Sequence, residues 1–287
     1  MPRLAYVNGS YVPHQNGAVH IEDRGFQFAD GVYEVVTVEH GALVDEEGHL
    51  TRLARSLDEL EMDWPMTARS LRLVMRQLIR RNRLRDGIIY LQITRGSAPR
   101  DFAYPTGVTP TIVMTTRRMN LHPRAREADG VSVVTIPDIR WKRRDIKSVA
   151  LLPQAMGKQK ARAAGAFEAW QVDEDGFVTE GCSSNAWIVT KDSVLVTRPA
   201  SNLILNGITR QSLLRIAQEI GLKVEERLFT VAEAYDAKEA FVSSATTYAT
   251  AVTQIDDAVI GNGKPGEFVS RLRSAYRAYA TGAGGQA

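Results

Sequence analysis

The first part of the chain contains several short apolar runs with the two-residue alternation of β-strands. The Asn8-Gly9 pair separates two such runs and predicts a tight hairpin turn. Residues 31–39 read GVYEVVTVE, a segment that is rich in β-branched residues and alternates in polarity. The strands expected in this part are residues 5–7, 11–12, 31–39, 41–44, 87–94 and 110–116.

Two segments between these strands have helical spacing instead. Residues 49–62 place Leu50, Leu53, Leu57 and Leu60 on one stripe of a helix. Residues 67–82 predict a second helix, which Thr67 can cap because its hydroxyl accepts a backbone N–H. Arginines alternate with apolar residues along this second helix, so we expect a solvated amphipathic helix and not a nucleic-acid surface.

The later part of the chain again mixes strands with helices. In residues 117–129 the apolar residues do not recur at the spacing of a helix or a strand, so this segment is the best candidate for a linker. We therefore expect two α+β domains, a small one at 1–116 and a larger one at 130–287, with the functional site between them. The elements expected in the larger domain are strands at 131–136, 167–172, 185–189, 193–197 and 239–243, and helices at 152–164, 209–220 and 266–279.

Composition narrows the range of functions. The 287-residue chain has a formal net charge of +3, which is too small a bias to favour nucleic acid or a membrane surface as a partner. Its one cysteine excludes an internal disulfide, and its five histidines lack the spacing of a helical zinc site, so we expect no metal. The amino terminus lacks the apolar core of a signal peptide, and no run of ~18 apolar residues occurs, which predicts a cytoplasmic protein.

Two polar segments stand out as candidates for chemistry. The first, RWKRRDIKS at 140–148, has the character of a strand and brings Lys147 to its end. The second, TEGCSSN at 179–185, contains Glu180. A lysine that forms a Schiff base and a carboxylate that holds a pyridinium nitrogen are the two groups that pyridoxal phosphate needs most. From the residues alone, Lys147 can equally be one of many surface cations, and Glu180 a turn residue.

In their sequence context and spacing these segments resemble the fold-type IV aminotransferases, and most closely the D-amino-acid aminotransferases among them. The resemblance covers residues 6–280 and has matching motifs in the same order. It implies a two-domain fold whose second domain, an α+β pseudo-barrel, carries the cofactor lysine. It also implies that Lys147 binds pyridoxal 5′-phosphate and that Glu180 keeps the ring nitrogen of this cofactor protonated.

Further cofactor residues follow from the same resemblance. The segment ILNGITR at 204–210 matches the family's phosphate cup, so Ile208 and Thr209 are expected to bind phosphate at a helix start. Leu205 is expected to pack on the ring face, and Arg52 to give the phosphate its charged contact. The run SSATT at 243–247 closes the cup, with contacts expected from Ser244 and Thr246. Ala245 departs from many relatives, which have threonine there.

Substrate contacts are expected at two other places. The segment DRGFQFADGVYEV at 23–35 matches an amino-terminal signature of D-amino-acid aminotransferases, in which Tyr33 lies beside the substrate. The loop RGSAPRDFAYP at 95–105 matches the loop that binds the substrate carboxylate. Arg100 is retained there, whereas Phe102 replaces a histidine of well-characterised relatives. How the carboxylate is held without this histidine is left open.

The resemblance implies a homodimeric enzyme that exchanges the amino group of a D-amino acid, such as D-alanine or D-glutamate, with a 2-oxo acid by ping-pong kinetics. Other substrates on the same fold remain alternatives: a branched-chain L-amino acid, an (R)-amine, or the substrate of an aminodeoxychorismate lyase. A cofactor-free binding protein that uses the arginine-rich helix is the alternative from another class. The preferred donor and acceptor and the physiological role are not predicted by the sequence.

Overall fold

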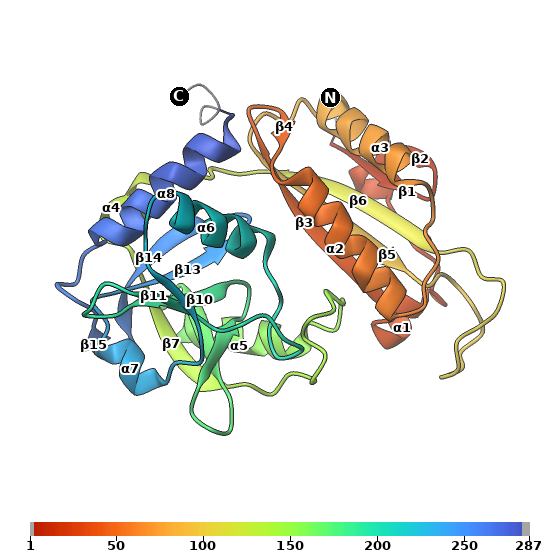
Figure 1. Cartoon of the computed structure of the whole chain (residues 1–287). Coiled ribbons are helices and arrows are strands. Elements are labelled where there is room, and N and C mark those ends of the chain that lie inside the picture. Colours follow the sequence, from red (N-terminus) through yellow and green to blue (C-terminus); the bar gives the residue numbers. More distant parts are fainter. Residues whose placement is uncertain (1–2, 283–287) are drawn as a thin grey trace. The chain divides into compact units, whose positions relative to one another are not determined.

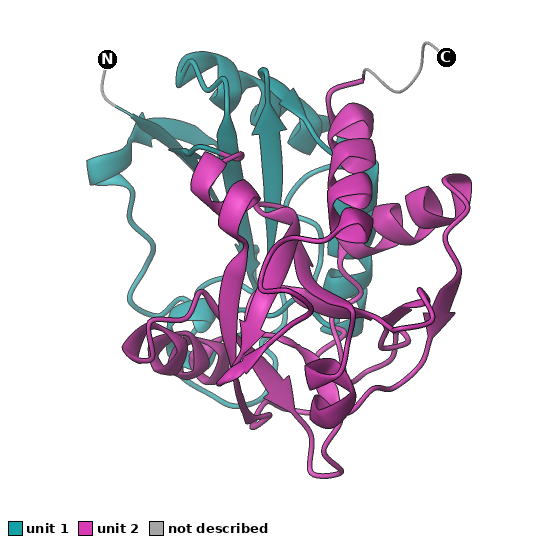
Figure 2. Cartoon of the chain, turned by 90° about the vertical axis from the view of Figure 1, so that its left-hand side faces the viewer, with its two compact units in different colours: residues 1–120, 146–150 teal, residues 121–145, 151–287 magenta. Residues whose placement is uncertain are grey.

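A computed structural model describes residues 3–282 of the chain. The chain forms two compact units, which Figure 2 distinguishes by colour. Unit 1 comprises Met1–Asn120 and Ile146–Ala150, and unit 2 comprises Leu121–Asp145 and Leu151–Ala287. Each unit has its own sheet and its own hydrophobic core.

Unit 1 is built on a six-stranded antiparallel sheet with the order β2-β1-β6-β5-β3-β4. Residues alternate between its two faces, so that Ile89, Leu91 and Ile93 of β5 enter the core while Tyr90 and Gln92 face the other side. The strands are β1 (Leu4–Val7), β2 (Ser10–Pro13), β3 (Gly31–Glu39), β4 (Ala42–Leu43), β5 (Gly87–Thr94) and β6 (Thr111–Arg118).

Helices α2 (Glu46–Glu59) and α3 (Ala68–Arg81) pack on this sheet, α2 against β3 and α3 against β1 and β6 (Figure 1). The expected Thr67 cap is confirmed, since the Thr67 hydroxyl accepts the Ser70 N–H at 3.1 Å. Helix α2 begins earlier than predicted because Asp45 adopts a left-handed conformation (φ 54°) and the acidic Glu46 and Glu47 occupy the first turn. A short helix, α1 (Arg24–Phe28), precedes β3 and was not predicted.

Unit 2 is built on a nine-stranded mixed sheet with the order β12-β11-β10-β13-β14-β7-β8-β9, and β15 pairs with β14. Strands β9 and β10 also contact each other, so the sheet curves back on itself. Its strands are β7 (Val131–Pro137), β8 (Glu168–Val172), β9 (Val178–Gly181), β10 (Asn185–Val189), β11 (Leu195–Thr197), β12 (Val224–Glu226), β13 (Glu239–Ser244), β14 (Tyr248–Ile255) and β15 (Ala258–Val259).

Apolar side chains fill both faces of this second sheet. Trp187 and Phe241 stack on one face, where α6 (Ile208–Glu219) and α8 (Glu267–Ala280) pack (Figure 1). Trp170 and Phe229 meet edge to face in the other cluster. The remaining helices of this unit are α4 (Arg124–Asp129), α5 (Leu152–Ala163) and α7 (Val231–Tyr235).

The expected linker and domain boundaries differ from the structure. Within residues 117–129, the first two residues complete β6 and the last six form α4. Residues 140–148, which were expected to be a strand, have an irregular backbone apart from an isolated bridge between Ser148 and Val32. Lys147 was expected in the second domain, yet its segment groups with unit 1. The reason is backbone pairing: the Tyr33 N–H donates to the Lys147 carbonyl at 3.0 Å, and the Val149 N–H donates to the Gly31 carbonyl at 2.9 Å.

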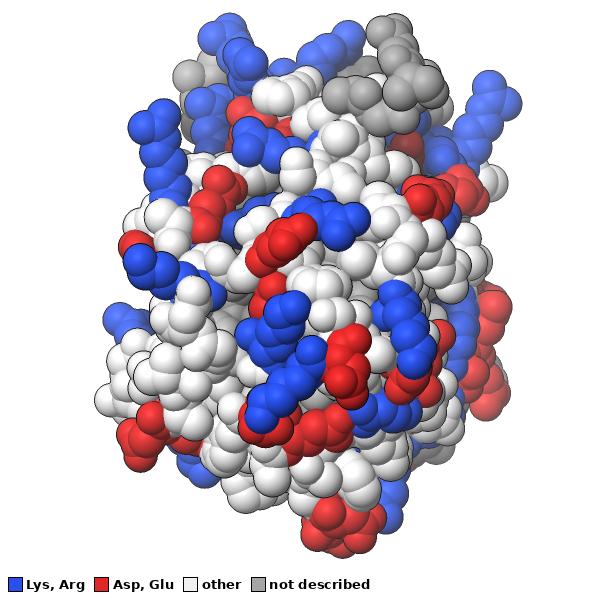
Figure 3. Space-filling model, turned by 60° about the vertical axis from the view of Figure 1, so that its left-hand side comes forward, with Lys and Arg blue, Asp and Glu red and all other residues white. Residues whose placement is uncertain are grey.

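Charges of both signs are interspersed on the molecular face drawn in Figure 3. On helix α3, Arg72 pairs with Glu47 and Arg76 pairs with Glu46 at 2.7 Å, as expected of a solvated amphipathic helix whose Leu71, Met75, Leu78 and Ile79 are buried. None of the helices within residues 3–282 has the length and apolarity needed to cross a bilayer.

Candidate active site

Lys147 lies beside strand β3 in unit 1. Its carbonyl accepts the Tyr33 N–H, and its own N–H donates to the Ser56 hydroxyl of α2 at 3.4 Å. These backbone contacts fix the start of the lysine side chain, whose Nζ lies 4.3 Å from the centroid of the Tyr33 ring. The structure thus brings together two residues that were predicted for the site, the nucleophilic amine and the substrate-side tyrosine.

A buried cluster around Glu34 lies next to them in sequence. Glu34 points from β3 towards α2, where it accepts two hydrogen bonds of 2.7 Å from Nε and Nη2 of Arg52 and a third of 2.7 Å from His49. Burial favours the neutral carboxyl, but the Arg52 guanidinium outweighs it and lowers the pKa of Glu34 to about 2. Arg52, the residue predicted to contact phosphate, is therefore held by a carboxylate that stays ionised.

Arg100 and Phe102 form a separate cluster in unit 1. They lie in the loop between β5 and β6, where the Arg100 guanidinium is 4.5 Å from the Phe28 ring and 5.7 Å from the Phe102 ring. The Phe28 and Phe102 rings are 5.5 Å apart. Phe102 is 82% exposed, so its ring can support the guanidinium without being part of the core.

The loop that carries Arg100 is anchored by buried charges. Asp30 binds both Arg24 and Arg95, at 2.7 Å and 2.8 Å. Arg24 then donates to the Asp101 carbonyl at 2.6 Å, which ties the loop to helix α1. The Arg95 guanidinium lies 3.6 Å from the Tyr104 ring centroid and secures the other end of the segment. The position of Arg100 is thus set by contacts on both sides of it.

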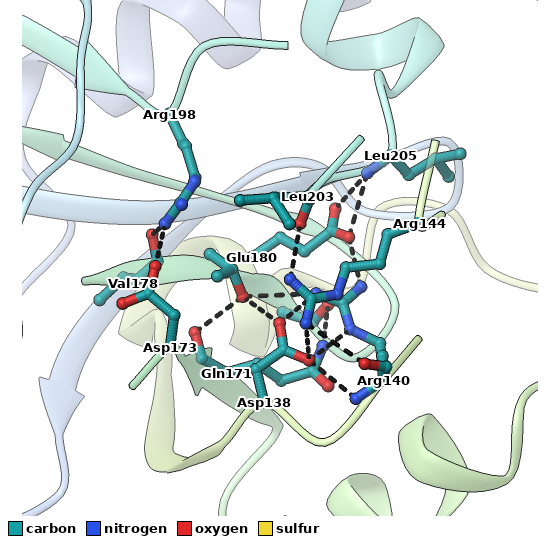
Figure 4. A network of polar contacts seen from close by, with 12 residues as sticks. Asp138, Arg140, Arg144, Gln171, Asp173, Val178, Glu180, Arg198, Leu203 and Leu205 are labelled. Atoms are coloured by element: carbon teal, nitrogen blue, oxygen red, sulfur yellow. Dashed lines mark hydrogen bonds and ion pairs between the residues drawn. The ribbon is translucent and has the colours of Figure 1, made fainter. Parts of the chain in front are cut away.

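In unit 2, Glu180 is the centre of a buried polar network, drawn in Figure 4. It lies on β9, a segment for which no strand was expected. Its carboxylate accepts one N–H from Arg140, one from the Asn185 side chain at 3.0 Å, and the Leu205 backbone N–H at 3.1 and 3.2 Å from its two oxygens. Burial raises the pKa of the Glu180 carboxyl, and the Arg140 guanidinium counteracts that rise.

Arg140 is shared between two carboxylates. Its Nε and Nη2 bind the two oxygens of Asp138 at 3.0 and 2.7 Å, while Nη1 reaches Glu180 (Figure 4). Arg144 also binds Asp138, at 3.3 Å, and donates to the Leu203 carbonyl at 3.3 Å. Burial opposes the charge of Arg140, but the two carboxylates outweigh burial and raise the pKa of Arg140 above its ordinary value.

The start of helix α6 lies directly beyond Leu205. Asn185 donates to the Leu205 carbonyl at 2.9 Å as well as to Glu180, so it joins this loop to the buried carboxylate. Gly207 is needed for this approach because a Cβ there would lie 2.2 Å from the Asn185 side-chain oxygen. Gly207 caps the helix without a side-chain hydrogen bond, so the N–H groups at Ile208 and Thr209 suit an anion.

Ser244 and Thr246 lie at the end of β13 and in the turn that follows it. The Ser244 hydroxyl contacts Thr246 Oγ1 at 3.3 Å and Thr247 Oγ1 at 2.8 Å, forming a small group of hydroxyls. Asn185 of β10 pairs with Ser243 in the sheet register, which brings this turn close to the Glu180 network. The cofactor residues predicted in unit 2 therefore lie on neighbouring elements.

The residues present fit pyridoxal phosphate. A carboxylate can accept about four hydrogen bonds, and among the described residues Glu180 accepts from three donor groups. Capacity therefore remains for the N–H of a protonated ring. The N–H groups at the start of α6 and the hydroxyls after β13 can bind a phosphate group.

Sequence reasoning had not proposed several residues that support the site, namely Asp138, Arg140, Asn185, Glu34 and His49. Arg140 and Asn185 contact Glu180, and Glu34 contacts Arg52. Asp138 and His49 act one step further away, through Arg140 and Glu34. Asn185 ends the TEGCSSN segment and was within reach of the sequence reasoning. Arg140 and Glu180 are 40 residues apart, so their pairing depends on the fold.

The comparisons with known proteins agree with this chemistry. A model of the amino-transferase class IV family matches residues 31–255. The D-alanine aminotransferase of Bacillus licheniformis is 43% identical over 268 residues, which cover 93% of this chain and 94% of that protein. The D-alanine aminotransferase of Staphylococcus haemolyticus is 36% identical over 274 residues, 96% of each chain.

Solved structures show the same fold. The branched-chain amino acid aminotransferase of Escherichia coli superposes with a TM-score of 0.91 at 22% identity, over 98% of this chain and 96% of that one. A further branched-chain amino acid aminotransferase, solved with pyridoxamine 5′-phosphate, gives a TM-score of 0.90 at 25% identity, over 98% of this chain and 95% of that one. With the family match across most of its length, the chain belongs to the class IV aminotransferases, enzymes of fold type IV that use pyridoxal phosphate.

Proposed function

We propose that this aminotransferase moves the amino group of a D-amino acid to a 2-oxo acid. The observation that carries the substrate assignment is the 43% identity, over 93% of the chain, to a D-alanine aminotransferase. The contact between Lys147 and Tyr33 and the buried Glu180 network support the chemistry. Pyridoxal phosphate, when bound, supplies an electron-withdrawing ring that eases removal of the proton from the substrate Cα.

Lys147 performs two tasks in this proposal. Its amine would hold the cofactor covalently, and the same amine, when free, would take the proton from the substrate Cα. The Tyr33 ring, 4.3 Å from Nζ, limits where the amine can move. The backbone contacts of Lys147 with Tyr33 and Ser56 hold the lysine in place independently of what its amine binds.

Glu180 would stabilise the positive charge of the ring nitrogen. Its carboxylate is already oriented by Arg140, Asn185 and the Leu205 N–H, so little reorganisation is needed when the ring binds. Leu205 would pack on the ring face. The N–H groups at Ile208 and Thr209, the hydroxyls of Ser244 and Thr246, and Arg52 would bind the phosphate.

Arg100 binds the substrate carboxylate. In the structure it lies over the rings of Phe28 and Phe102, which orient a guanidinium without neutralising its charge. Phe102 replaces the second donor of relatives with an aromatic support. The carboxylate of the D-amino acid is thus held by a single charged contact, with Tyr33 beside the substrate.

We also propose that the enzyme is a homodimer located in the cytoplasm. Phe26 and Phe102 are 76% and 82% exposed in the single chain, and a partner subunit that covered these side chains would bury apolar surface. Analytical ultracentrifugation tests the dimer: a sedimenting species of one chain at micromolar concentration would contradict it.

The stereochemical assignment is tested with a panel of paired enantiomers. Purified enzyme with pyridoxal phosphate is supplied with 2-oxoglutarate and either D- or L-alanine or D- or L-leucine, and with pyruvate as the acceptor when the donor is D- or L-glutamate. The proposed function predicts product with the D-enantiomers and a visible absorption band from the bound cofactor. Preference for L-leucine would identify a branched-chain enzyme instead, and turnover of (R)-1-phenylethylamine above all amino acids would identify an amine transaminase.

A further inference from the structure

Arg140 makes its bidentate contact with Asp138 and not with Glu180. Its Nε and Nη2 bind Asp138 Oδ1 and Oδ2, and only Nη1 reaches Glu180. The Asp138 side chain is fully buried, and the Thr179 hydroxyl donates to it at 2.7 Å. The position of Arg140 beside Glu180 therefore depends on a second carboxylate that does not itself contact Glu180 among the described residues.

This geometry matters for what Glu180 can bind. A guanidinium can bind a carboxylate through two parallel N–H groups, here called its fork, which for Arg140 are those of Nε and Nη2. In this geometry it occupies both oxygens of the carboxylate. If the fork of Arg140 turned to Glu180, it would add a donor to an oxygen that already accepts from Asn185 and Leu205. Asp138 prevents this by keeping the fork, so Glu180 retains the capacity to accept one further N–H.

The net charge of the network also indicates that Asp138 matters for the binding of a protonated ring. Asp138 and Glu180 are negative and Arg140 and Arg144 are positive, so the four side chains sum to zero. A protonated ring adds one positive charge, which the buried network accommodates only if no excess cation is present beforehand. Without the charge of Asp138, the network is already positive and disfavours a protonated ring.

We infer that Asp138 is a positioning residue for Glu180: by holding the fork of Arg140 it keeps the Glu180 carboxylate oriented and available to the cofactor ring nitrogen. This inference rests on the proposed contact between Glu180 and that nitrogen. Arg140 and Thr179 are the other members of the arrangement, Arg140 as the link and Thr179 as the support of Asp138.

The test compares Asp138→Asn with a matched control, Asp173→Asn. Asp173 also pairs with a buried arginine of the network, Arg198 at 2.8 Å, but has no contact with Arg140 or Glu180 among the described residues (Figure 4). Each apoenzyme is titrated with pyridoxal phosphate by tryptophan fluorescence, and its Tm is recorded. Asp138→Asn should raise the Kd of the cofactor about tenfold or more, since a charge-assisted arrangement is lost. Asp173→Asn should stay within about twofold, whatever it does to Tm.

A double-mutant cycle separates positioning from general stability. In the Glu180→Gln background, Asp138→Asn should change the Kd by less than about twofold, because the carboxylate it serves is gone. Thr179→Val, which keeps the side-chain volume, should weaken cofactor binding by a factor of about 2–5 in the wild type and not in Glu180→Gln. If Asp138→Asn does not fold, the cycle with Thr179→Val decides the question.

Equal Kd values for wild type, Asp138→Asn and Thr179→Val would overturn the inference, as would losses of the same size with and without Glu180. Either result leaves the proposed function intact as long as the wild-type enzyme binds pyridoxal phosphate and transaminates. Failure of the wild-type protein to bind the cofactor would instead refute the proposed function itself.

Discussion

The clusters around Glu34 in unit 1 and Glu180 in unit 2 use the same residue types in different arrangements. Glu34 receives the two-pronged edge of Arg52 and a hydrogen bond from His49, and the pKa of Glu34 falls to about 2. Glu180 receives one N–H of an arginine whose fork is bound elsewhere, and burial raises its pKa. Each carboxylate accepts three N–H groups from the described residues, but Glu34 binds two of them from one arginine, whereas Glu180 shares its arginine with Asp138.

Under the proposed function, Glu34 serves mainly the fold and Glu180 serves the chemistry. A buried ion pair with full bidentate geometry holds its partner, here Arg52, in a fixed place. A carboxylate that receives a single N–H of a shared arginine has no bidentate partner of its own, which suits an incoming donor. Changes to the two clusters should therefore have separable effects on stability and on catalysis.

The largest effect is expected at the lysine, which neither cluster can replace. Lys147→Ala should lower transamination by on the order of 10⁴-fold or more, because both the covalent attachment and the proton transfer are lost. The fold should survive, since the lysine is anchored by its backbone. Steady-state rates and circular dichroism check this. Near-normal turnover would assign the chemistry to another residue.

Glu180→Gln should cause the second-largest loss of activity. The amide cannot hold a positive ring nitrogen, so kcat should fall by on the order of 10²–10³-fold while the protein still binds pyridoxal phosphate. Glu34→Gln is the matched comparison because it also removes a buried negative charge. If both variants lose kcat equally at unchanged Tm, the distinction between the two clusters does not hold.

Acid stability should depend on Glu34. Its folded pKa of about 2 lies below the ordinary 4.5, so the ionised carboxylate stabilises the fold above about pH 4.5, and this contribution is lost as the pH falls through about 2. The shift corresponds to about 3 kcal/mol in the free energy of unfolding. Urea unfolding at several pH values measures the gap between wild type and Glu34→Gln. The gap should close on acidification, and a constant gap would show that Glu34 does not titrate as described.

Arg100 offers a third arrangement, an arginine that lies over aromatic rings. Because its charge is not neutralised by those rings, Arg100→Leu should reduce kcat/KM for D-alanine by about 10–150-fold, the value of one charge-assisted hydrogen bond. An amine without a carboxylate, (R)-1-phenylethylamine, should lose far less. Phe102→His should favour D-amino acids by adding a donor. Equal losses on both substrate types for Arg100→Leu would mean that this arginine is structural.

The fold could be predicted from the sequence where one face of a strand is buried. Strands β3 and β5 have the bounds expected from their alternation, because Glu34, Leu91 and Ile93 face helices while their neighbours do not. Strand β14 (Tyr248–Ile255) was not predicted, because its small and polar residues are buried on both faces and give no alternation. Residues 140–148 were taken as a strand, yet only Lys147 and Ser148 at the end of this segment make backbone contacts with β3.

The candidate site was predicted unevenly for a similar reason. Residues in compact motifs, such as Lys147 and Glu180, could be proposed from their local sequence. Asp138 could not, because its role depends on Arg140 and Thr179, the latter from a strand 41 residues further along the chain. The partner of Arg52 was likewise missed, since Glu34 lies on a different element and reads as an ordinary strand residue.

The most direct test of the account is to locate the cofactor on the chain. The purified enzyme with pyridoxal phosphate is reduced with borohydride, digested, and its peptides are mapped by mass spectrometry. We expect one modified residue, Lys147, and no modification in Lys147→Ala. Attachment to a different lysine, or to none, would contradict the assignment of Lys147 and with it the proposed mechanism.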